Sequence, residues 1–312
     1  VIPMHILHLN DTSSVTGGVE VYLHDLFAEL KRSGVATTFA HGSGDGAAFP
    51  AARQLPLLSQ SVLWQRQNES YSRTVQTLAE LQPSAVHVHN IHNINALAAC
   101  LDNVPTFLHL HDYRYICPAS TFFYRTSGST CGLSPGPHCL WHAATSGCLT
   151  PRPQIAIAYL QRVRWVIAHS HRFAGIFCNS SHVRERLCAA GVAPHHAEVL
   201  HYFCSFDVPG EAATPGTPPY VLFVGRFRAY KGTRDFVECV ARLPNGVRGI
   251  MIGDVTPETS MQIMNQAISL GCSDRLELRP WTSRPEIRDA ISHATVTIFP
   301  SIWDEPFGLV GL

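Results

Sequence analysis

Short apolar segments alternate with longer amphipathic segments along most of the chain. Runs rich in Ile, Leu, Val and Phe are typical of strands buried on both faces of a sheet, and apolar residues three or four positions apart predict helices between them. In the first unit, a strand at 5–9 is followed by a loop, by a helix at 19–33 with Gly34 as its C-cap, and by a strand at 35–40. This alternation predicts an α/β fold in which helices cover parallel sheets.

The same pattern continues through the first two thirds of the chain. Strands are expected at 85–89, 106–112 and 175–179, and helices at 61–81, 94–101, 153–169 and 181–190. Two of these strands end in polar residues, among them His89, Asn90 and His111. Because the carboxyl ends of parallel strands meet at one edge of a sheet, we expect these side chains to lie along that edge.

A change of composition then divides the chain. Residues 208–219 are rich in Pro, Gly and Thr, which is typical of a linker. Beyond them, strands are expected at 220–224, 247–252, 276–278 and 295–299, and helices at 233–243, 259–270 and 285–293. We therefore expect an N-terminal domain at 1–207 and a C-terminal domain at 220–312, each built on a parallel sheet, with a cleft between them.

Composition narrows the classes of protein without identifying the function. The chain has 312 residues, 46% of them hydrophobic and 15% charged, which is typical of globular domains. Basic and acidic residues number 23 each, so no overall charge attracts the protein to nucleic acid. The sequence contains no apolar run long enough to span a membrane and no signal-peptide pattern, so a cytoplasmic location is expected.

An acidic loop follows the last predicted strand. Glu305 lies beside Pro306 and Gly308, at the start of an expected helix. Ligands of open α/β sheets bind at this end of the strands, and the free amides of a helix N-terminus suit an anion. Glu305 could hold sugar hydroxyls close to a phosphate, although a solvated loop acid is the alternative.

Two glycine-containing loops suit a diphosphate. Arg226 and Lys231 lie between the first strand and the first helix of the second domain, where they would supply charged donors. Gly17 and Gly18 precede the first helix and would let the backbone approach the same ligand from the other domain. A basic surface loop and a tight turn without a ligand are the alternatives. His111, beside Asp112, could contact a sugar oxygen or have a purely structural role.

Regular periodicity fails between residues 113 and 153, where Gly, Pro, Ser and Cys predominate. Cys117, Cys131, Cys139 and Cys148 lie in this insertion, with two histidines nearby. Four thiolates in a loop without a core of its own would suit a structural zinc ion. Free buried thiols, disulfides and an iron–sulfur centre are the alternatives.

Arginines interleave with apolar residues along the helix expected at 153–169. Arg152, Arg162, Arg164 and Arg172 could form a basic face that contacts anionic lipid at the inner side of a membrane. A packed helix with solvated arginines is the alternative that we favour.

The ordered motifs resemble those of the retaining glycosyltransferases of the GT-B fold, in the large family 4 or group 1 type, over nearly the whole chain. The motifs are Gly17-Gly18-Val19-Glu20, Val86-His87-Val88-His89-Asn90, Leu110-His111-Asp112, Phe223-Val224-Gly225-Arg226 with Lys231-Gly232, and Pro300-Ser301 with Glu305-Pro306-Phe307-Gly308-Leu309-Val310. The resemblance implies two Rossmann-like domains that face each other across a cleft. It also implies a hexosyltransferase that uses a nucleoside-diphosphate sugar and a polysaccharide, glycolipid or other glycoconjugate acceptor.

The resemblance assigns roles to individual residues. Arg226 and Lys231 would bind the donor diphosphate, with Gly17 and Gly18 against it. Glu305 would hold hydroxyls of the donor sugar, and His111 would contact the sugar near the reacting carbon. The backbone amides of Phe307, Gly308 and Leu309 would lie near sugar and phosphate. The family transfers the sugar with retention of configuration and requires no bound metal for catalysis.

One departure concerns the end of the chain. The family pattern has a second glutamate eight positions after the first, at position 313, whereas the sequence ends at Leu312. The resemblance therefore implies an incomplete second domain, in a fragment or a truncated protein. Two other functions stay open: a catalytically silent protein that binds a sugar or a partner, and an epimerase or phosphorylase of the same fold.

Overall fold

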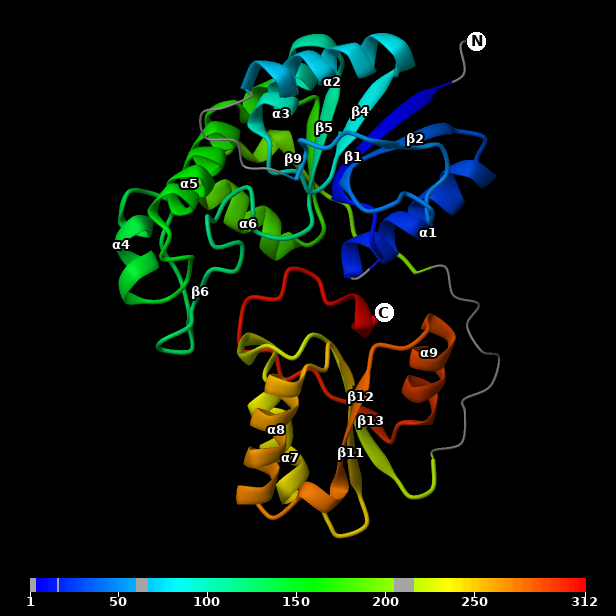
Figure 1. Cartoon of the computed structure of the whole chain (residues 1–312), viewed down its shortest axis with the longest axis vertical. Helices are drawn as coiled ribbons and strands as arrows, with labels where there is room; N and C mark the ends of the chain where they lie inside the picture. The colour runs from blue at the N-terminus through cyan, green and yellow to red at the C-terminus, as the bar shows by residue number, and fades with distance from the viewer. Residues whose placement is uncertain (1–3, 16, 60–66, 205–215) are drawn as a thin grey trace.

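Two parallel β-sheets form the centres of two lobes (Figure 1). The computed structural model describes residues 4–15, 17–59, 67–204 and 216–312. The chain first builds the lobe that contains α1 to α6 and then the lobe that contains α7 to α9, and its C-terminal segment lies between the two lobes (Figure 1). The α/β fold predicted from the sequence is confirmed.

The first lobe has a seven-stranded sheet in the order β3-β2-β1-β4-β5-β8-β9. Its strands are β1 (His5–Thr12), β2 (Ala36–Ser43), β3 (Ala52–Gln54), β4 (Ala85–Val88), β5 (Thr106–Leu110), β8 (Gly175–Cys178) and β9 (Ala197–Val199). All the neighbouring strands pair in parallel. The edge strands β3 and β9 were not predicted, because three residues are too few to establish a periodic pattern.

Helices cover both faces of this sheet. They are α1 (Gly18–Arg32), α2 (Gln67–Leu81), α3 (Ile94–Asn103), α5 (Pro153–Ala168) and α6 (Ser181–Ala189). α1 buries Tyr22, Leu23 and Phe27 against aromatic residues of one face, as its apolar spacing predicts. The expected start of α2 at 61–66 lies outside the described residues. α3 begins where the side chain of Asn93 accepts hydrogen bonds from two backbone amides.

The second lobe has a four-stranded parallel sheet in the order β12-β11-β10-β13. Its elements are β10 (Tyr220–Val224), α7 (Thr233–Arg242), β11 (Arg248–Gly253), α8 (Pro257–Ser269), β12 (Leu276–Pro280), α9 (Arg284–His293) and β13 (Val296–Thr297). α8 begins two residues before the predicted start, because Thr256 forms a capping box and a proline suits the first helical position. Separate apolar clusters lie on the two faces of the sheet. Residues 205–215, which include most of the predicted linker, lie outside the described ranges.

The chain after β13 differs from the prediction. The strand expected at 295–299 is regular only over Val296–Thr297, and the helix expected after Glu305 is a single 3-10 turn, Leu309–Gly311. Prolines at 300 and 306 remove backbone donors, and Gly308 adopts φ 80°, outside the helical region. These residues keep 298–308 as an extended loop that reaches the first lobe.

The insertion contains a short antiparallel pair, β6 (Phe123–Tyr124) with β7 (Ser129–Thr130), and the helix α4 (His138–Thr145). It projects from the side of the first lobe next to α5 (Figure 1). Of the arginines expected to be solvated, Arg152, Arg164 and Arg172 are exposed, but the expectation is wrong for Arg162 on α5, which is only 1% exposed. Its guanidinium donates to the backbone carbonyl of Arg114, so this arginine holds the start of the insertion against α5. In the described ranges, no helix combines the length and the apolar character needed to cross a bilayer.

Candidate active site between the lobes

Three loops meet between the lobes, each at the carboxyl end of a parallel strand. They are the loop after β1, which contains Gly17 and Gly18, the loop after β10, which contains Arg226 and Lys231, and the loop after β13, which contains Glu305. We call the residues 17–18, 226, 231, 305 and 307–309 the interlobe site. Most of the predicted binding residues therefore lie together, at the place where open α/β sheets bind ligands.

Glu305 and Lys231 form the charged centre of the interlobe site. The Lys231 ammonium donates to both carboxylate oxygens of Glu305, with each N–O distance 2.7 Å. Ser301 Oγ and Trp303 Nε1 also donate to Oε2, at 3.1 and 2.9 Å. The side chain of Lys231 is 22% exposed and that of Glu305 is 28% exposed, so a ligand could reach both of them. The carboxylate is thus fixed by neighbours from its own loop while it neutralises the lysine.

A glycine turn positions Lys231. Gly232 adopts φ 71°, and a Cβ atom at this position would lie 1.8 Å from the carbonyl oxygen of Pro300. Only glycine therefore permits the close approach of the loops after β10 and β13. The backbone amide of Ile302 donates to the carbonyl of Tyr230 at 3.0 Å and joins the same two loops.

The glycines of the first lobe face this pair of loops. A Cβ atom on Gly17 would lie 2.8 Å from Nη2 of Arg226, and one on Gly18 would lie 3.4 Å from Cδ1 of Leu309. Glu20 lies in the same turn, and burial raises the pKa of its carboxyl group. A side chain at position 17 would displace the Arg226 guanidinium, so the absence of one brings a cationic group against the first lobe.

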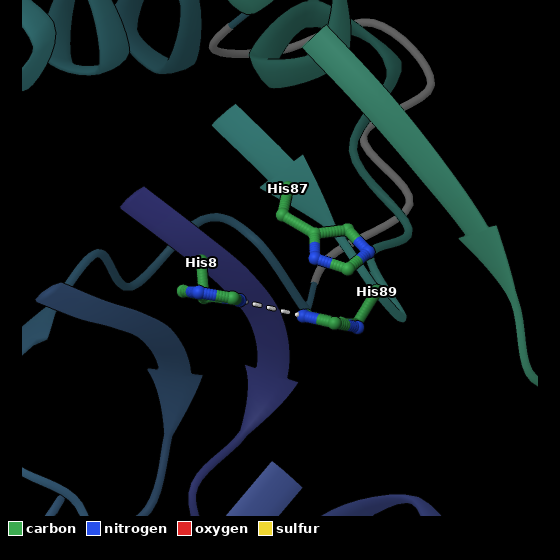
Figure 2. Close-up of side chains that lie close together, drawn as sticks. All are labelled: His8, His87 and His89. Atoms are coloured by element: carbon green, nitrogen blue, oxygen red, sulfur yellow. Dashed lines mark hydrogen bonds between the residues drawn. The ribbon is translucent and has the colours of Figure 1, made fainter. Parts of the chain in front are cut away.

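His111 lies at one end of a chain of buried imidazoles. A hydrogen bond of 3.0 Å joins His8 Nδ1 and His89 Nε2 (dashed line in Figure 2), and another of 2.8 Å joins His89 Nδ1 and His111 Nε2. His111 Nδ1 bonds the hydroxyl of Tyr202. Since each neutral imidazole carries one proton, the hydrogen bonds along this chain must all run in the same direction. Parallel pairing of β1 with β4 and of β4 with β5 aligns the histidines on one face of the sheet.

Burial keeps these histidines neutral. It lowers the pKa of His8, His89 and His111 well below the usual value, and neighbouring histidines lower it further. Two trios, His8 with His87 and His89 and His89 with His109 and His111, place ring nitrogens within 4.8 Å of one another, as metal ligands would. Hydrogen bonds join His8 with His89 and His89 with His111, whereas the rings of His87 and His109 pack on His89 and His111 at centroid distances of 4.2 Å.

The predicted sugar contact of His111 remains a prediction. Both of its ring nitrogens bond protein groups in this structure, and the residue is 4% exposed. The connection to the interlobe site passes through Tyr202, whose ring lies 4.9 Å from that of Phe307. Sequence reasoning missed Tyr202, because it follows the short edge strand β9 in a segment without periodicity.

Among the described residues, arginine–aspartate pairs join the lobes beside the interlobe site. Asp25 on α1 binds Arg284 at the start of α9 through two contacts of 2.8 Å, and Arg186 on α6 pairs with Asp304. The Asp25 side chain is 3% exposed and that of Arg284 is 33% exposed. A buried carboxylate in a bidentate pair ties the lobes more firmly than an exposed pair would. The sequence contains no signal for this pairing, because the partners are 259 positions apart.

We expect Arg284→Ala to lower the free energy of unfolding by about 2–4 kcal/mol, because it removes the guanidinium from a buried carboxylate. Arg242→Ala is the matched control, since Arg242 is exposed on α7 and, in the described part of the chain, pairs with Glu238 of its own helix. That control should cost less than about 0.5 kcal/mol. Urea denaturation followed by fluorescence measures both values, and equal values would contradict a stabilising role for the interlobe pair.

The four insertion cysteines lie apart from the interlobe site. Cys117, Cys131, Cys139 and Cys148 all border a separate pocket within the insertion. All four are free thiols in this structure.

Two models of glycosyltransferase families together match nearly the whole chain. The family model described as Glycosyltransferase Family 4 matches residues 16–204, and that described as Glycosyl transferases group 1 matches residues 207–312. The D-inositol 3-phosphate glycosyltransferase of Xylanimonas cellulosilytica is 32% identical over 98 residues, which are 31% of this chain and 23% of that protein. The chain thus matches less than a quarter of that relative's length.

Solved structures share the fold over nearly the full chain. The Anabaena protein HepE (Alr3699), in complex with UDP and glucose, superposes with a TM-score of 0.66 at 17% identity, covering 98% of this chain and 77% of that one. The lipopolysaccharide outer core galactosyltransferase WaaB gives a TM-score of 0.60 at 16% identity, covering 98% and 76%. A glycosyltransferase from Rickettsia africae gives 0.65 at 13% identity, covering 97% and 74%. These matches confirm the predicted GT-B fold.

Proposed function

Because this chain belongs to glycosyltransferase family 4, we propose that it transfers a hexose from a nucleoside-diphosphate sugar to a polysaccharide, glycolipid or other glycoconjugate acceptor, with retention of anomeric configuration. The observation that carries this proposal is the pairing of Lys231 with Glu305 beside Arg226 and the glycines of the first lobe. The two cations, Arg226 and Lys231, suit the diphosphate of such a donor, and the carboxylate of Glu305 suits its sugar. The expected cytoplasmic location is part of the proposal.

When the donor binds, its diphosphate would replace Glu305 as the partner of Lys231. Arg226 and Lys231 would then contact the diphosphate, and Glu305 would be free to accept hydrogen bonds from sugar hydroxyls. Ser301 and Trp303 would keep the carboxylate in position during this exchange, since their hydrogen bonds do not involve the lysine. The ion pair would therefore preorganise both groups for the donor.

Bond cleavage would leave negative charge on the departing diphosphate. Arg226 and Lys231 would stabilise that charge, together with the backbone amides of residues 307–309 and the backbone of Gly17 and Gly18, which have no side chain to keep the ligand away. Groups fixed in advance stabilise such charge without reorganisation during the reaction. In the proposed mechanism the leaving oxygen accepts the acceptor's proton on the same face of the sugar, so configuration is retained.

His111 would contribute through its position. Burial raises the pKa of Tyr202 well above its usual value, so its hydroxyl stays protonated at neutral pH. The Tyr202 hydroxyl bonds His111, and the Tyr202 ring packs on Phe307. Through these two contacts His111 would help to hold the 307–309 amides toward the donor. A rotation of the His111 or Tyr202 side chain would break the hydrogen bond between them and let His111 contact the sugar.

A UDP-sugar is the first donor to test, because the similar Anabaena protein was crystallised with UDP and glucose. We expect UDP at saturating concentration to raise the unfolding temperature by roughly 5 °C, since ligand at a hundred times its Kd stabilises by about 2.7 kcal/mol. Differential scanning fluorimetry measures the shift, with GDP and ADP as comparison nucleotides.

UMP and uridine are the controls, because they lack the second phosphate that Arg226 and Lys231 would bind. Equal shifts for UMP and UDP would contradict diphosphate recognition. A shift with GDP or ADP alone would keep the diphosphate site and change the donor base. No shift with any nucleoside diphosphate would contradict the proposed function.

A further inference from the structure

The insertion has too few buried apolar residues to hold its outer half. Its first part joins the main core through Tyr113, Tyr115, Ile116, Cys117 and Phe122. Beyond that part, Phe123 is buried, and the next apolar cluster has Ala143 and Leu149 of the insertion and Ala156 of α5 as its buried members. A segment of this size with so small a core commonly depends on a metal or on disulfides.

We propose that the insertion binds one structural zinc ion through Cys117, Cys131, Cys139 and Cys148. These four cysteines, from four separate segments, line one pocket with a cavity volume of about 30 Å³, which is room for a single ion. Four thiolates complete a closed tetrahedral zinc site with Zn–S distances near 2.3 Å. Zinc(II) is redox-inert and binds thiolates tightly, so it would join the four segments without further chemistry.

Zinc would draw the cysteines closer than they lie in this structure. Among the described residues, no three of the four sulfur atoms fall within 4.8 Å of one another. A Cβ atom on Gly132, beside Cys131, would meet no atom within 4 Å, and one on Gly147, beside Cys148, would meet Thr126 and Arg125 only at ordinary contact distances of 3.6 and 3.8 Å, so both positions lie in open surroundings. Binding and ordering of the outer half would therefore be a single event, as in small metal-stabilised domains.

Neighbouring polar groups suit thiolate ligands. The Tyr124 hydroxyl is 3.1 Å from Cys131 Sγ and could donate to that sulfur once it is ionised. His142 lines the same pocket, but its Nδ1 bonds Ser146 Oγ at 3.0 Å, which holds the ring beside the site. Such outer contacts orient metal ligands and balance their charge.

With zinc bound, the insertion would also support the interlobe site. The backbone amide of Cys131 donates to the carbonyl of Phe122, whose ring contacts Arg186. The next residue, Phe123, lies 6.2 Å from the ring of Tyr230, and Tyr230 packs on Trp303 at 4.9 Å. This aromatic contact ends next to Lys231, whose ammonium is 5.1 Å from Trp303. This second role rests on the proposed function, whereas zinc binding itself does not.

The test is metal analysis of the full chain purified without a chelator. We expect about one zinc per chain and, after exchange, a cobalt form with the visible absorption of a tetrahedral thiolate site. Cys139→Ser should reduce bound zinc to less than roughly 0.2 per chain. Cys239→Ser, in α7 of the other lobe, is the matched control and should retain the metal.

If Cys139→Ser does not fold, wild-type protein decides the question. Removal of zinc by a chelator should lower the unfolding temperature by roughly 5 °C or more, and added zinc should restore it. Absence of metal, disulfides among the four cysteines, or iron with sulfide would each overturn the proposal. Zinc in a chain that binds no nucleotide would support the metal site and contradict only the proposed function.

Discussion

Lys231→Ala should lower the rate of sugar transfer by about 10²–10³-fold, because it removes a preorganised cation from the leaving diphosphate. Glu305 would keep its hydrogen bonds from Ser301 and Trp303, so the loop should stay folded. The Lys231 and Glu305 side chains are partly exposed, and loss of their ion pair should cost less than about 1 kcal/mol of stability. Steady-state kinetics with the identified donor, together with thermal unfolding, measures both effects.

Arg228→Ala is the control for position and charge. Arg228 lies in the same loop as Lys231 but pairs with Asp254 at 2.9 Å, away from Glu305. We expect the rate of sugar transfer by Arg228→Ala to stay within about threefold of wild type, since the diphosphate loses no proposed contact in this variant. Wild-type turnover in Lys231→Ala, or an equal loss in Arg228→Ala, would contradict the assignment of Lys231.

Glu305→Gln separates the charge of this residue from its shape. The amide side chain can still accept hydrogen bonds from its neighbours but cannot form the ion pair with Lys231. If sugar hydroxyls bind the carboxylate most strongly during transfer, kcat should fall more than KM rises. A change in KM alone would instead indicate a role in ground-state binding.

Acidification should unfold the first lobe between about pH 6.5 and 4, because its core contains neutral histidines. The unfolded chain protonates histidine near pH 6.5, whereas burial lowers the pKa of His87 to about 4 in the folded protein. Burial also lowers the pKa of His8, His89, His109 and His111 well below the usual value. Below pH 6.5 the unfolded state thus binds more protons, so the free energy of unfolding falls as the pH falls.

The expected effect is large compared with total stability. Each such histidine contributes about 1.4 kcal/mol per pH unit in this range, and His87 alone up to about 3 kcal/mol in all. Among the described residues, the titratable groups next to these histidines include the phenols of Tyr22 and Tyr202, the imidazole of His5 near His8 and the guanidinium of Arg114 near His111. None of these provides a carboxylate that would stabilise a protonated ring. Urea titrations at several pH values measure the slope.

His109→Leu offers a sharp test of this pH dependence. In the described part of the chain neither ring nitrogen of His109 has a hydrogen-bond partner, although the residue is fully buried. Leucine removes both the unpaired polar atoms and one titrating group, so stability at pH 7 should rise by about 1–2 kcal/mol and the acid slope should decrease by about one proton. The exposed His195→Leu is the matched control, and an equal change of slope in both variants would contradict the explanation.

Much of the fold could be predicted from local patterns. The helix with Gly34 at its end, the strands that precede each site loop and the alternation of both lobes follow from periodicity and turn chemistry over a few residues. Short edge strands and the irregular path after β13 could not be predicted, because they depend on partners and on proline and glycine effects beyond any periodic run.

The sequence by itself determined which residue types stand at the ends of the parallel strands, with Gly18 after a strand of the first sheet and Arg226, Lys231 and Glu305 after strands of the second. Tertiary structure alone decided which side chains bond: Lys231 with Glu305, His111 with Tyr202, and Asp25 with Arg284. The reason is physical. Hydrophobic periodicity reports which face of an element is buried, whereas contacts between residues 74 to 259 positions apart depend on strand order, register and the approach of the two lobes.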